Sequence, residues 1–260
     1  MWHKFLMDLT DTSDAATFII SFSKNGDFSA EVTDYQYVLI QNMVDFFMSN
    51  GTAEIEIDYL NDVGTLLLPR RLGMWLAWRK KMNFIEGGWL IPDMQIPLNF
   101  YPKNSNIQLK IIETLGSVYG IKYFSRLKRN ITRPDLYNEV SVLLPEDWLS
   151  QPEKLVKALQ MLDISYLDVS HLIKLSAHHR TILSISYDWE FVIQVSLVFE
   201  DPNELWLNNF NQLHPDTGFL TKLQHTLVKE KYPVMVELKF CPEFNEAIFH
   251  YKVSNLNDFI

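Results

Sequence analysis

The stretch TFIISFSKNGDFSAEV, residues 17–32, decides the class of fold. Apolar and polar side chains alternate in Thr17–Ser23 and again in Asp27–Val32, as they do in strands with one buried face. Asn25-Gly26 separates the two runs, and both residues tolerate the positive φ of tight hairpin turns. The stretch therefore predicts a pair of antiparallel strands.

The residues after this hairpin predict a helix and a second hairpin. Asp34 can cap a helix that runs to Met48, because the apolar residues between them recur at helical spacing. Ala53–Tyr59 alternates isoleucine with acidic residues, which predicts a strand with an acidic outer face, and Val63–Leu68 is expected to pair with it. Such a face either blocks a basic site on another protein or is a solvated surface that discourages edge pairing.

The last third of the chain predicts a similar order of elements. Two runs of β-branched and aromatic residues predict a hairpin, two helical segments follow, and two further strands come last. These segments are Thr181–Tyr187, Glu190–Glu200, 203–212, 218–230, Val234–Phe240 and Glu246–Val253. The predicted fold class is α+β, with antiparallel β-sheets and packed helices, and the repeated order admits two similar ββαββ-like lobes.

Charge is segregated along the chain, whose overall net charge is −9. Residues 1–68 carry a net −9, residues 69–133 a net +9 and residues 134–260 a net −9. We expect an N-terminal α+β lobe of residues 1–133, which contains the basic segment, and a C-terminal acidic α+β lobe of residues 134–260; one large domain is the alternative. The basic segment is either neutralised by the acidic ends or forms a face for an anionic partner.

The most basic part of that segment is Arg70–Met82, RRLGMWLAWRKKM, which predicts a helix. Arginine and tryptophan dominate the energetics of protein interfaces, so another protein is the expected partner. Cations beside indoles also suit phosphates and stacked bases, which leaves nucleic acid as a possible partner of residues 70–133. The third interpretation is an ordinary amphipathic helix with buried tryptophans. The candidate partner-binding residues are Arg70, Arg71, Trp75, Trp78, Arg79, Lys80 and Lys81.

A second candidate site lies near the end of the chain. Pro215-Asp216 is followed, after a spacer of twenty residues, by Glu237-Leu238-Lys239 in an apolar strand. This spacing resembles the motif of restriction-endonuclease-like nucleases. The resemblance implies that Asp216 and Glu237 hold Mg²⁺ and that Lys239 assists the attacking water. The alternative is an ordinary strand whose even-numbered residues face the core while Glu237 and Lys239 face outward.

The remaining features give no signal for several common classes of site. One cysteine, Cys241, cannot form an internal disulfide, and no apolar run reaches the length of a membrane-spanning helix, so a cytoplasmic protein is expected. The chain contains no nucleophile elbow, phosphate-binding loop, dinucleotide motif or zinc motif, and no cofactor or metal is predicted. The sequence therefore predicts a non-enzymatic protein–protein interaction protein, such as an inhibitor, immunity protein or assembly adaptor. The alternative is a Mg-dependent nuclease or nucleic-acid-binding protein.

Overall fold

The computed structural model describes ten strands of one closed barrel, four helices and a small two-stranded sheet. The described residues are 17–23, 28–34, 40–49, 54, 57–58, 60–61, 73–79, 84–91, 96–97, 106–131, 138–164, 180–188, 190–213, 233–240 and 245–253. No helix among them is long and apolar enough to cross a membrane.

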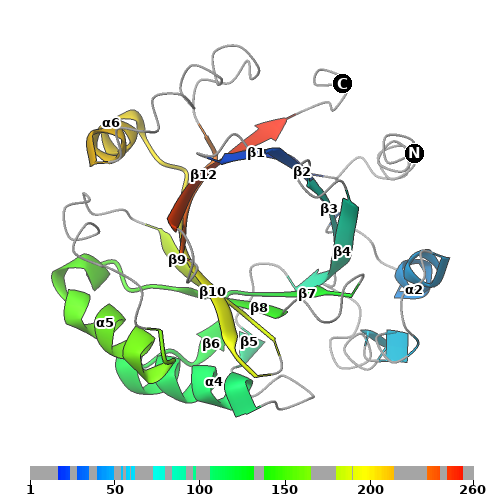
Figure 1. Cartoon of the computed structure of the whole chain (residues 1–260), viewed down its shortest axis with the longest axis horizontal. Coiled ribbons are helices and arrows are strands. Elements are labelled where there is room, and N and C mark those ends of the chain that lie inside the picture. The colour runs from blue at the N-terminus through cyan, green and yellow to red at the C-terminus, as the bar shows by residue number, and fades with distance from the viewer. Residues whose placement is uncertain are drawn as a thin grey trace.

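The barrel closes because its first and last strands pair with each other (Figure 1). Its strands follow the order β1-β12-β11-β10-β9-β8-β7-β4-β3-β2, and each is antiparallel to both neighbours. Their bounds are β1 Thr17–Ser23, β2 Phe28–Asp34, β3 Gly73–Arg79, β4 Phe84–Ile91, β7 Arg126–Asn130, β8 Asn138–Leu143, β9 Thr181–Tyr187, β10 Val192–Glu200, β11 Met235–Phe240 and β12 Asn245–Val253. Closure leaves no free sheet edge in the barrel.

The helices lie outside the barrel, around its wall (Figure 1). The outer elements are α2 Ile40–Ser49, α4 Asn106–Tyr119, η2 Trp148–Ser150, α5 Pro152–Met161, α6 Glu204–Leu213, and a small sheet of β5 Ile96–Pro97 and β6 Tyr123–Phe124. α4 and α5 pack against each other, and Leu115 and Leu159 of these two helices are buried. The wall is therefore covered on its outer side by apolar helix faces.

Each strand turns one row of side chains outward into the core and the other row into the barrel. On β10 and β11 the outward residues include Phe199, Val236 and Leu238, which belong to one large apolar cluster with the helices. Trp206 on α6 packs against this wall, with its ring centroid 4.7 Å from that of Phe199 and 5.2 Å from that of Phe210. The hydrophobic core thus lies between wall and helices, outside the barrel lumen.

Several predicted elements are confirmed. Thr17–Ser23 and Phe28–Asp34 form the predicted antiparallel pair, in which Phe22 lies opposite Phe28. The strands predicted in the last third are β9, β10, β11 and β12. The chain is a mixture of curled antiparallel sheet and a few helices, as predicted in outline. That sheet includes strands from both halves of the chain. The division into two lobes between residues 133 and 134, and the similarity of the two lobes, stay predictions.

The helix predicted for Arg70–Met82 is wrong, because Gly73–Arg79 is strand β3. Met74 and Leu76 are buried on its outer side, and Trp75 and Ala77 are buried on its inner side. A strand covered on both faces shows no alternation of hydropathy, so its sequence cannot be distinguished from a buried helix by periodicity.

The acidic strand predicted for Ala53–Tyr59 is also wrong, because the described residues of this stretch are helical. Ile57 and Leu60 are buried, whereas Glu54 and Asp58, four residues apart, are exposed. This burial follows the helical period, in which residues three or four apart share a face. The predicted partner strand, Val63–Leu68, lies outside the described residues.

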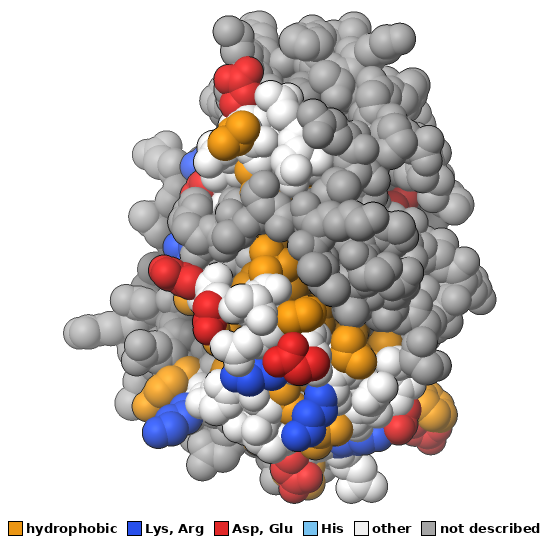
Figure 2. Space-filling view, turned by 90° about the vertical axis from the view of Figure 1, so that its left-hand side faces the viewer, with side chains coloured by type: hydrophobic (Ala, Val, Ile, Leu, Met, Phe, Trp, Pro, Cys, Tyr) orange, Lys and Arg blue, Asp and Glu red, His pale blue; other side chains and the backbone are white. Residues whose placement is uncertain are grey.

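Part of the positive charge of the basic segment is neutralised by acidic residues within the molecule. Three ion pairs join basic residues of the segment 69–133 to acidic residues outside it: Lys110–Asp163, Arg126–Glu139 and Lys128–Glu31. On the face in Figure 2, the described acidic and basic side chains lie close together with hydrophobic side chains between them. These contacts favour the first of the two interpretations of the basic segment.

Gly88 on β4 is required by the close approach of β7. A Cβ atom at position 88 would lie 1.7 Å from the backbone oxygen of Arg129 and 2.8 Å from its carbonyl carbon. Trp75 lies opposite Gly88 in the β3–β4 register, and its Nε1 donates a hydrogen bond of 3.1 Å to the same Arg129 oxygen. The glycine thus lets the indole reach over β4 to the next strand.

We predict that Gly88→Ala lowers the free energy of unfolding by about 3 kcal/mol, because backbone atoms of β7 must move to admit the methyl group. The matched control is Gly116→Ala in α4, where the nearest atom to the added Cβ is 3.8 Å away. That control should gain about 0.5–1 kcal/mol from helix propensity. Urea unfolding of both variants measures the difference, and equal stabilities of the two variants would contradict the prediction.

Candidate functional site

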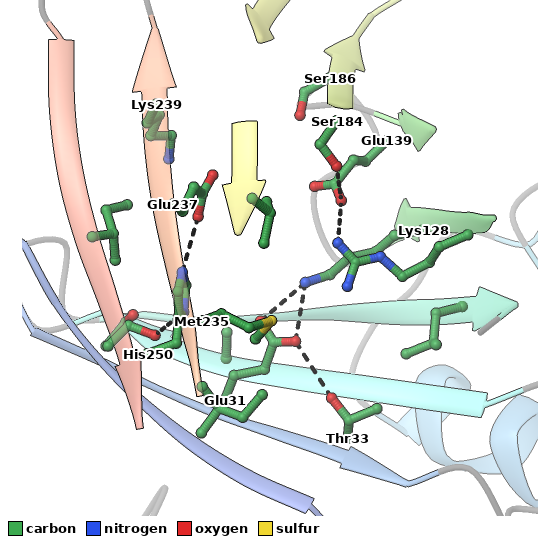
Figure 3. Close-up of a pocket in the computed structure, with 18 of the residues that line it drawn as sticks. Glu31, Thr33, Lys128, Glu139, Ser184, Ser186, Met235, Glu237, Lys239 and His250 are labelled. Atoms are coloured by element: carbon green, nitrogen blue, oxygen red, sulfur yellow. Dashed lines mark hydrogen bonds and ion pairs between the residues drawn. The ribbon is translucent and has the colours of Figure 1, made fainter. Parts of the chain in front are cut away.

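The candidate site is the lumen of the barrel, a cavity of about 230 Å³ to which all ten strands contribute (Figure 3). Its lining is mostly polar, because the inward rows of most strands carry serine, glutamate, lysine or arginine, whereas β3 and β4 contribute Ala77 and Leu90. The polar lining residues are Ser21, Ser29, Glu31, Thr33, Arg126, Lys128, Glu139, Ser184, Ser186, Gln194, Glu200, Glu237, Lys239 and His250.

Four glutamates and three lysine or arginine side chains line this cavity, so its formal charge is about balanced. Charges in a partly enclosed space interact more strongly than on an open surface, because less water screens them. Most of these groups are therefore held in pairs or networks, which fix the directions in which they point.

The first pair joins Glu31 on β2 to Lys128 on β7, although β3 and β4 lie between these strands. The Lys128 Nζ lies 3.0 and 3.1 Å from the two carboxylate oxygens of Glu31 and 3.9 Å from the ring centroid of Trp75. Thr33 donates a further hydrogen bond of 3.4 Å to Glu31 (Figure 3). The ammonium group is thus fixed inside the lumen by an ion pair and a cation–π contact.

The second network centres on Glu139 of β8. The Arg126 Nη2 lies 3.1 Å from the Glu139 Oε1, and the Ser184 hydroxyl donates to the same oxygen over 3.1 Å. The Ser141 and Ser184 oxygens are 2.6 Å apart. This network directs the guanidinium toward the lumen from the wall formed by β7, β8 and β9.

The third network runs from β11 through β12 to β1. The Glu237 Oε2 lies 3.2 Å from the His250 Nε2, and the His250 Nδ1 lies 2.8 Å from the Ser21 Oγ. Ser196 donates to the Glu237 Oε1 over 2.6 Å. The Glu237 and His250 side chains are only 17% and 15% exposed, so this chain of hydrogen bonds is largely shielded from bulk water.

Glu237 remains ionised within this network. Burial alone would raise the pKa of its carboxyl group. The hydrogen bond from His250, the charge of Lys239 and the hydrogen bond from Ser196 outweigh burial and hold the pKa well below its ordinary value of 4.5. Lys239 lies beside Glu237 on β11 and forms no ion pair with another described residue.

The two predicted sites fall differently in the structure. Glu237 and Lys239 are in the lumen, so the interpretation that they face outward is wrong, whereas Val236 and Leu238 pack in the core as expected. Asp216 lies outside the described residues, so its predicted approach to Glu237 is not tested.

Of the predicted partner-binding residues, Trp75 is fully buried on the lumen side of β3. Trp78 and Arg79 belong to the same strand, but their side chains are outside the described part of the structure. Arg70, Arg71, Lys80 and Lys81 are also outside it. A protein partner, and nucleic-acid contact through residues 70–133, stay predictions.

The sequence does not predict most of the lumen residues, among them Ser21, Glu31, Lys128, Glu139 and His250. Their signal is visible in hindsight, since polar residues recur at many of the alternate positions of their strands. The same alternation is typical of a sheet with one solvated face. Only closure of the sheet turns that face into the lining of a cavity.

Comparison with known proteins gives a likeness of fold. No family model matches the chain. The structure of 6-dimethylallyltryptophan synthase from Micromonospora olivasterospora, in complex with DMASPP and Trp, has a TM-score of 0.64 and 8% identity, covering 92% of this chain and 82% of that one. For 5-dimethylallyltryptophan synthase from Streptomyces coelicolor the TM-score is 0.56 at 10% identity, covering 91% and 80%. The apo form of the prenyltransferase PriB gives 0.51 at 10%, covering 92% and 80%.

One sequence relative shares a short stretch. A PH domain-containing protein of Dictyostelium discoideum is 46% identical over 63 residues, which is 24% of this chain and 13% of that protein. The chain therefore spans about an eighth of this relative's length, and the match does not establish a family.

These comparisons correct the predicted function. The solved structures that share the barrel are those of prenyltransferases, which are enzymes. A non-enzymatic interaction protein, such as an inhibitor, immunity protein or assembly adaptor, is therefore the wrong class, and so is a restriction-endonuclease-like nuclease. The physical reason is closure, because charged residues expected on an open surface line an internal cavity instead.

We predict that Glu237→Gln is most destabilising near neutral pH. The pKa of Glu237 is lower in the folded protein than its ordinary 4.5, so its ionised form stabilises the fold fully above that value. This contribution is lost as the pH falls from about 5 toward the lower pKa of the folded state. The measurement is the difference in unfolding free energy between variant and wild type, which should shrink from pH 7 to pH 3.

The matched control for this prediction is Glu113→Gln, which removes an exposed carboxylate from α4, away from the lumen. A difference between Glu237→Gln and wild type that stays constant or grows toward pH 3 would contradict the assigned direction of the Glu237 shift.

Proposed function

We propose that this chain is a prenyltransferase-type enzyme, which transfers an allylic group from a diphosphate to an aromatic acceptor inside the barrel. The observation that carries the proposal is a closed ten-stranded barrel with a lumen of about 230 Å³ lined by charged side chains of both signs. The likeness of fold to dimethylallyltryptophan synthases supports the choice of donor and acceptor.

The cationic side chains of the lumen suit a diphosphate. Arg126 and Lys128 are two positions apart on β7, so both side chains face the cavity. Lys239 faces the same cavity from β11. Guanidinium and ammonium groups form strong charge-assisted hydrogen bonds to phosphate oxygens. Glu139 and Glu31 hold the first two cations extended into the lumen, so little conformational entropy remains to be lost when an anion binds.

An aromatic acceptor would lie against the apolar part of the lumen. Trp75, Ala77 and Leu90 form a separate buried cluster on the inner face of β3 and β4. This patch is adjacent to Lys128, whose ammonium lies over the Trp75 ring. An acceptor packed there would have its apolar face on the patch and its polar groups toward the charged wall.

The proposed reaction has three changes in bonding. The bond between the allylic carbon and the diphosphate oxygen breaks, and the diphosphate leaves with the electron pair. A new bond forms between that carbon and a nucleophilic atom of the acceptor, and the acceptor loses one proton. The cations of the lumen stabilise the charge that develops on the leaving oxygen, as preorganised groups do in other enzymes.

The test is transfer of the dimethylallyl group from dimethylallyl diphosphate to tryptophan. Transfer is measured by the mass of the product and by the amount of diphosphate released. We predict that Lys128→Met weakens binding of the diphosphate about 10- to 100-fold, since a hydrogen bond to a charged group contributes about 1.5–3 kcal/mol. Lys157→Met, an exposed site on α5, is the matched control and should match wild type.

Titration calorimetry with dimethylallyl diphosphate measures this binding without any turnover. Absence of both binding and transfer by the wild-type chain would contradict the proposed function. Equal binding by wild type and Lys128→Met would contradict only the assignment of Lys128 to the diphosphate.

A further inference from the structure

Ser21, His250 and Glu237 form one continuous hydrogen-bonded chain at the seam where the barrel closes. Ser21 on β1 and His250 on β12 lie directly opposite each other in the register, which places both side chains on the lumen side. Glu237 reaches His250 diagonally from β11. Figure 3 shows Glu237 and His250 pointing toward each other inside the lumen.

The donors and acceptors in this chain follow from the ionised carboxylate. An ionised glutamate can only accept hydrogen bonds, so the His250 Nε2 that faces it must carry a proton and donate. In a neutral imidazole the other nitrogen is then an acceptor, so the Ser21 hydroxyl donates to the His250 Nδ1. A hydroxyl, an imidazole and a carboxylate are thus aligned for movement of a proton.

We propose that Ser21, His250 and Glu237 are a proton relay that removes a proton from an N–H or O–H group of a ligand in the lumen. Ser21 touches the ligand, and His250 is the final proton acceptor. As the ligand proton moves to the Ser21 oxygen, the serine proton moves to the His250 Nδ1. The resulting imidazolium faces the Glu237 carboxylate, so no charge is left without compensation.

The ligands that this relay suits are phenols, indoles and other weak acids with one exchangeable N–H or O–H. The inference rests on and deepens the proposed function, because an acceptor that forms its new bond at nitrogen or oxygen must lose the proton of that atom, and the relay names the destination of that proton. It also holds for any other weak acid that binds in the lumen. Ser21 and His250 are then catalytic residues, and Glu237 is a positioning residue.

His250 shares the cavity with several charged groups. These groups are Glu237 and Lys239 on β11, Glu31 on β2, Arg126 and Lys128 on β7, Glu139 on β8 and Glu200 on β10. Glu31 is paired with Lys128, and Glu200 is paired with Arg180. Of these carboxylates, Glu237 is the one that the structure places in hydrogen-bonding contact with the imidazole.

A nucleophilic role for Ser21 fits the surrounding backbone less well. Acyl transfer needs donors that stabilise an oxyanion, and these are often free backbone N–H groups. Ser21 lies in the middle of β1, which pairs with β2 on one side and β12 on the other. Its backbone groups are thus part of the sheet ladder, and the side chain is left to act on protons.

The first test measures the tautomer of His250 by NMR on the full chain labelled with ¹⁵N-histidine. The chain has seven histidines, so the His250 signals are assigned by their loss in His250→Gln. We expect a proton on Nε2 and a hydrogen-bonded, unprotonated Nδ1, whose signal shifts in Ser21→Ala. A neutral ring with its proton on Nδ1 would overturn the relay.

The second test is kinetic and uses dimethylallyl diphosphate and tryptophan. We expect kcat to fall about 10²- to 10⁴-fold in His250→Gln and in Ser21→Ala, with little change in KM. The acidic limb of the pH profile of kcat/KM should disappear in His250→Gln, and Ser21→Thr should restore activity because it keeps the hydroxyl. Ser117→Ala and Glu113→Gln, both exposed on α4, are controls that should match wild type.

The outcomes separate the relay from the proposed function. Undiminished kcat in His250→Gln would overturn the relay and leave the proposed function standing. Absence of transfer by the wild-type chain, together with the expected tautomer, would remove the proposed function and support the relay for another acidic ligand. Covalent labelling of Ser21 by a fluorophosphonate would overturn the relay in favour of a serine nucleophile.

Discussion

Pairing of β1 with β12 is the interaction on which the rest of the structure depends. Six consecutive register positions, from Phe18 opposite Val253 to Ser23 opposite Ile248, join the two sides of the sheet and close it. Without this seam the inward rows of the strands would be a solvated face, and their charges would be screened by water. With it, the same rows surround a cavity in which charged groups interact strongly and are held in fixed directions.

The outer face of the barrel wall must be apolar and the inner face is polar, and alternation of side chains along each strand supplies both. The outward row supplies the apolar surface that packs against the helices and contributes most of the hydrophobic stabilisation. The inward row carries groups whose burial is costly unless they are paired. Lys128 with Glu31, Arg126 with Glu139, and His250 with Glu237 supply that pairing. Most of the hydrophobic stabilisation therefore lies outside the barrel, and the inner face carries the paired polar groups.

Local features of the fold could be predicted from the sequence, whereas the arrangement of the strands could not. The turn at Asn25-Gly26 and the alternation around it identify the first hairpin correctly. The helix that the sequence predicts at Gly73–Arg79 is wrong, because covering both faces of a strand removes the alternation that distinguishes it from a helix. The order in which strands pair depends on contacts far apart in the chain, which periodicity does not report.

The candidate site was hidden for a related reason. Ser21 and His250 are 229 positions apart, and nothing local at either residue indicates the other. Glu237 and Lys239 were singled out, but as members of a metal-binding motif with Asp216. They lie in the lumen because alternate residues of a barrel strand point inward, and Glu237 and Lys239 belong to the inward row of β11. The sequence shows the types of residue, but it does not show that closure of the sheet brings them together in one cavity.

The separation of the two seam strands also bears on how the protein acquires its shape. A contact between residues 229 positions apart closes a very long loop, and folds dominated by such contacts assemble slowly. During synthesis the β1 strand must wait, with one of its edges unpaired, until β12 has left the ribosome. The hydrogen-bonded chain at the seam is thus among the last parts of the molecule to form, and a partly made polypeptide cannot have a working site.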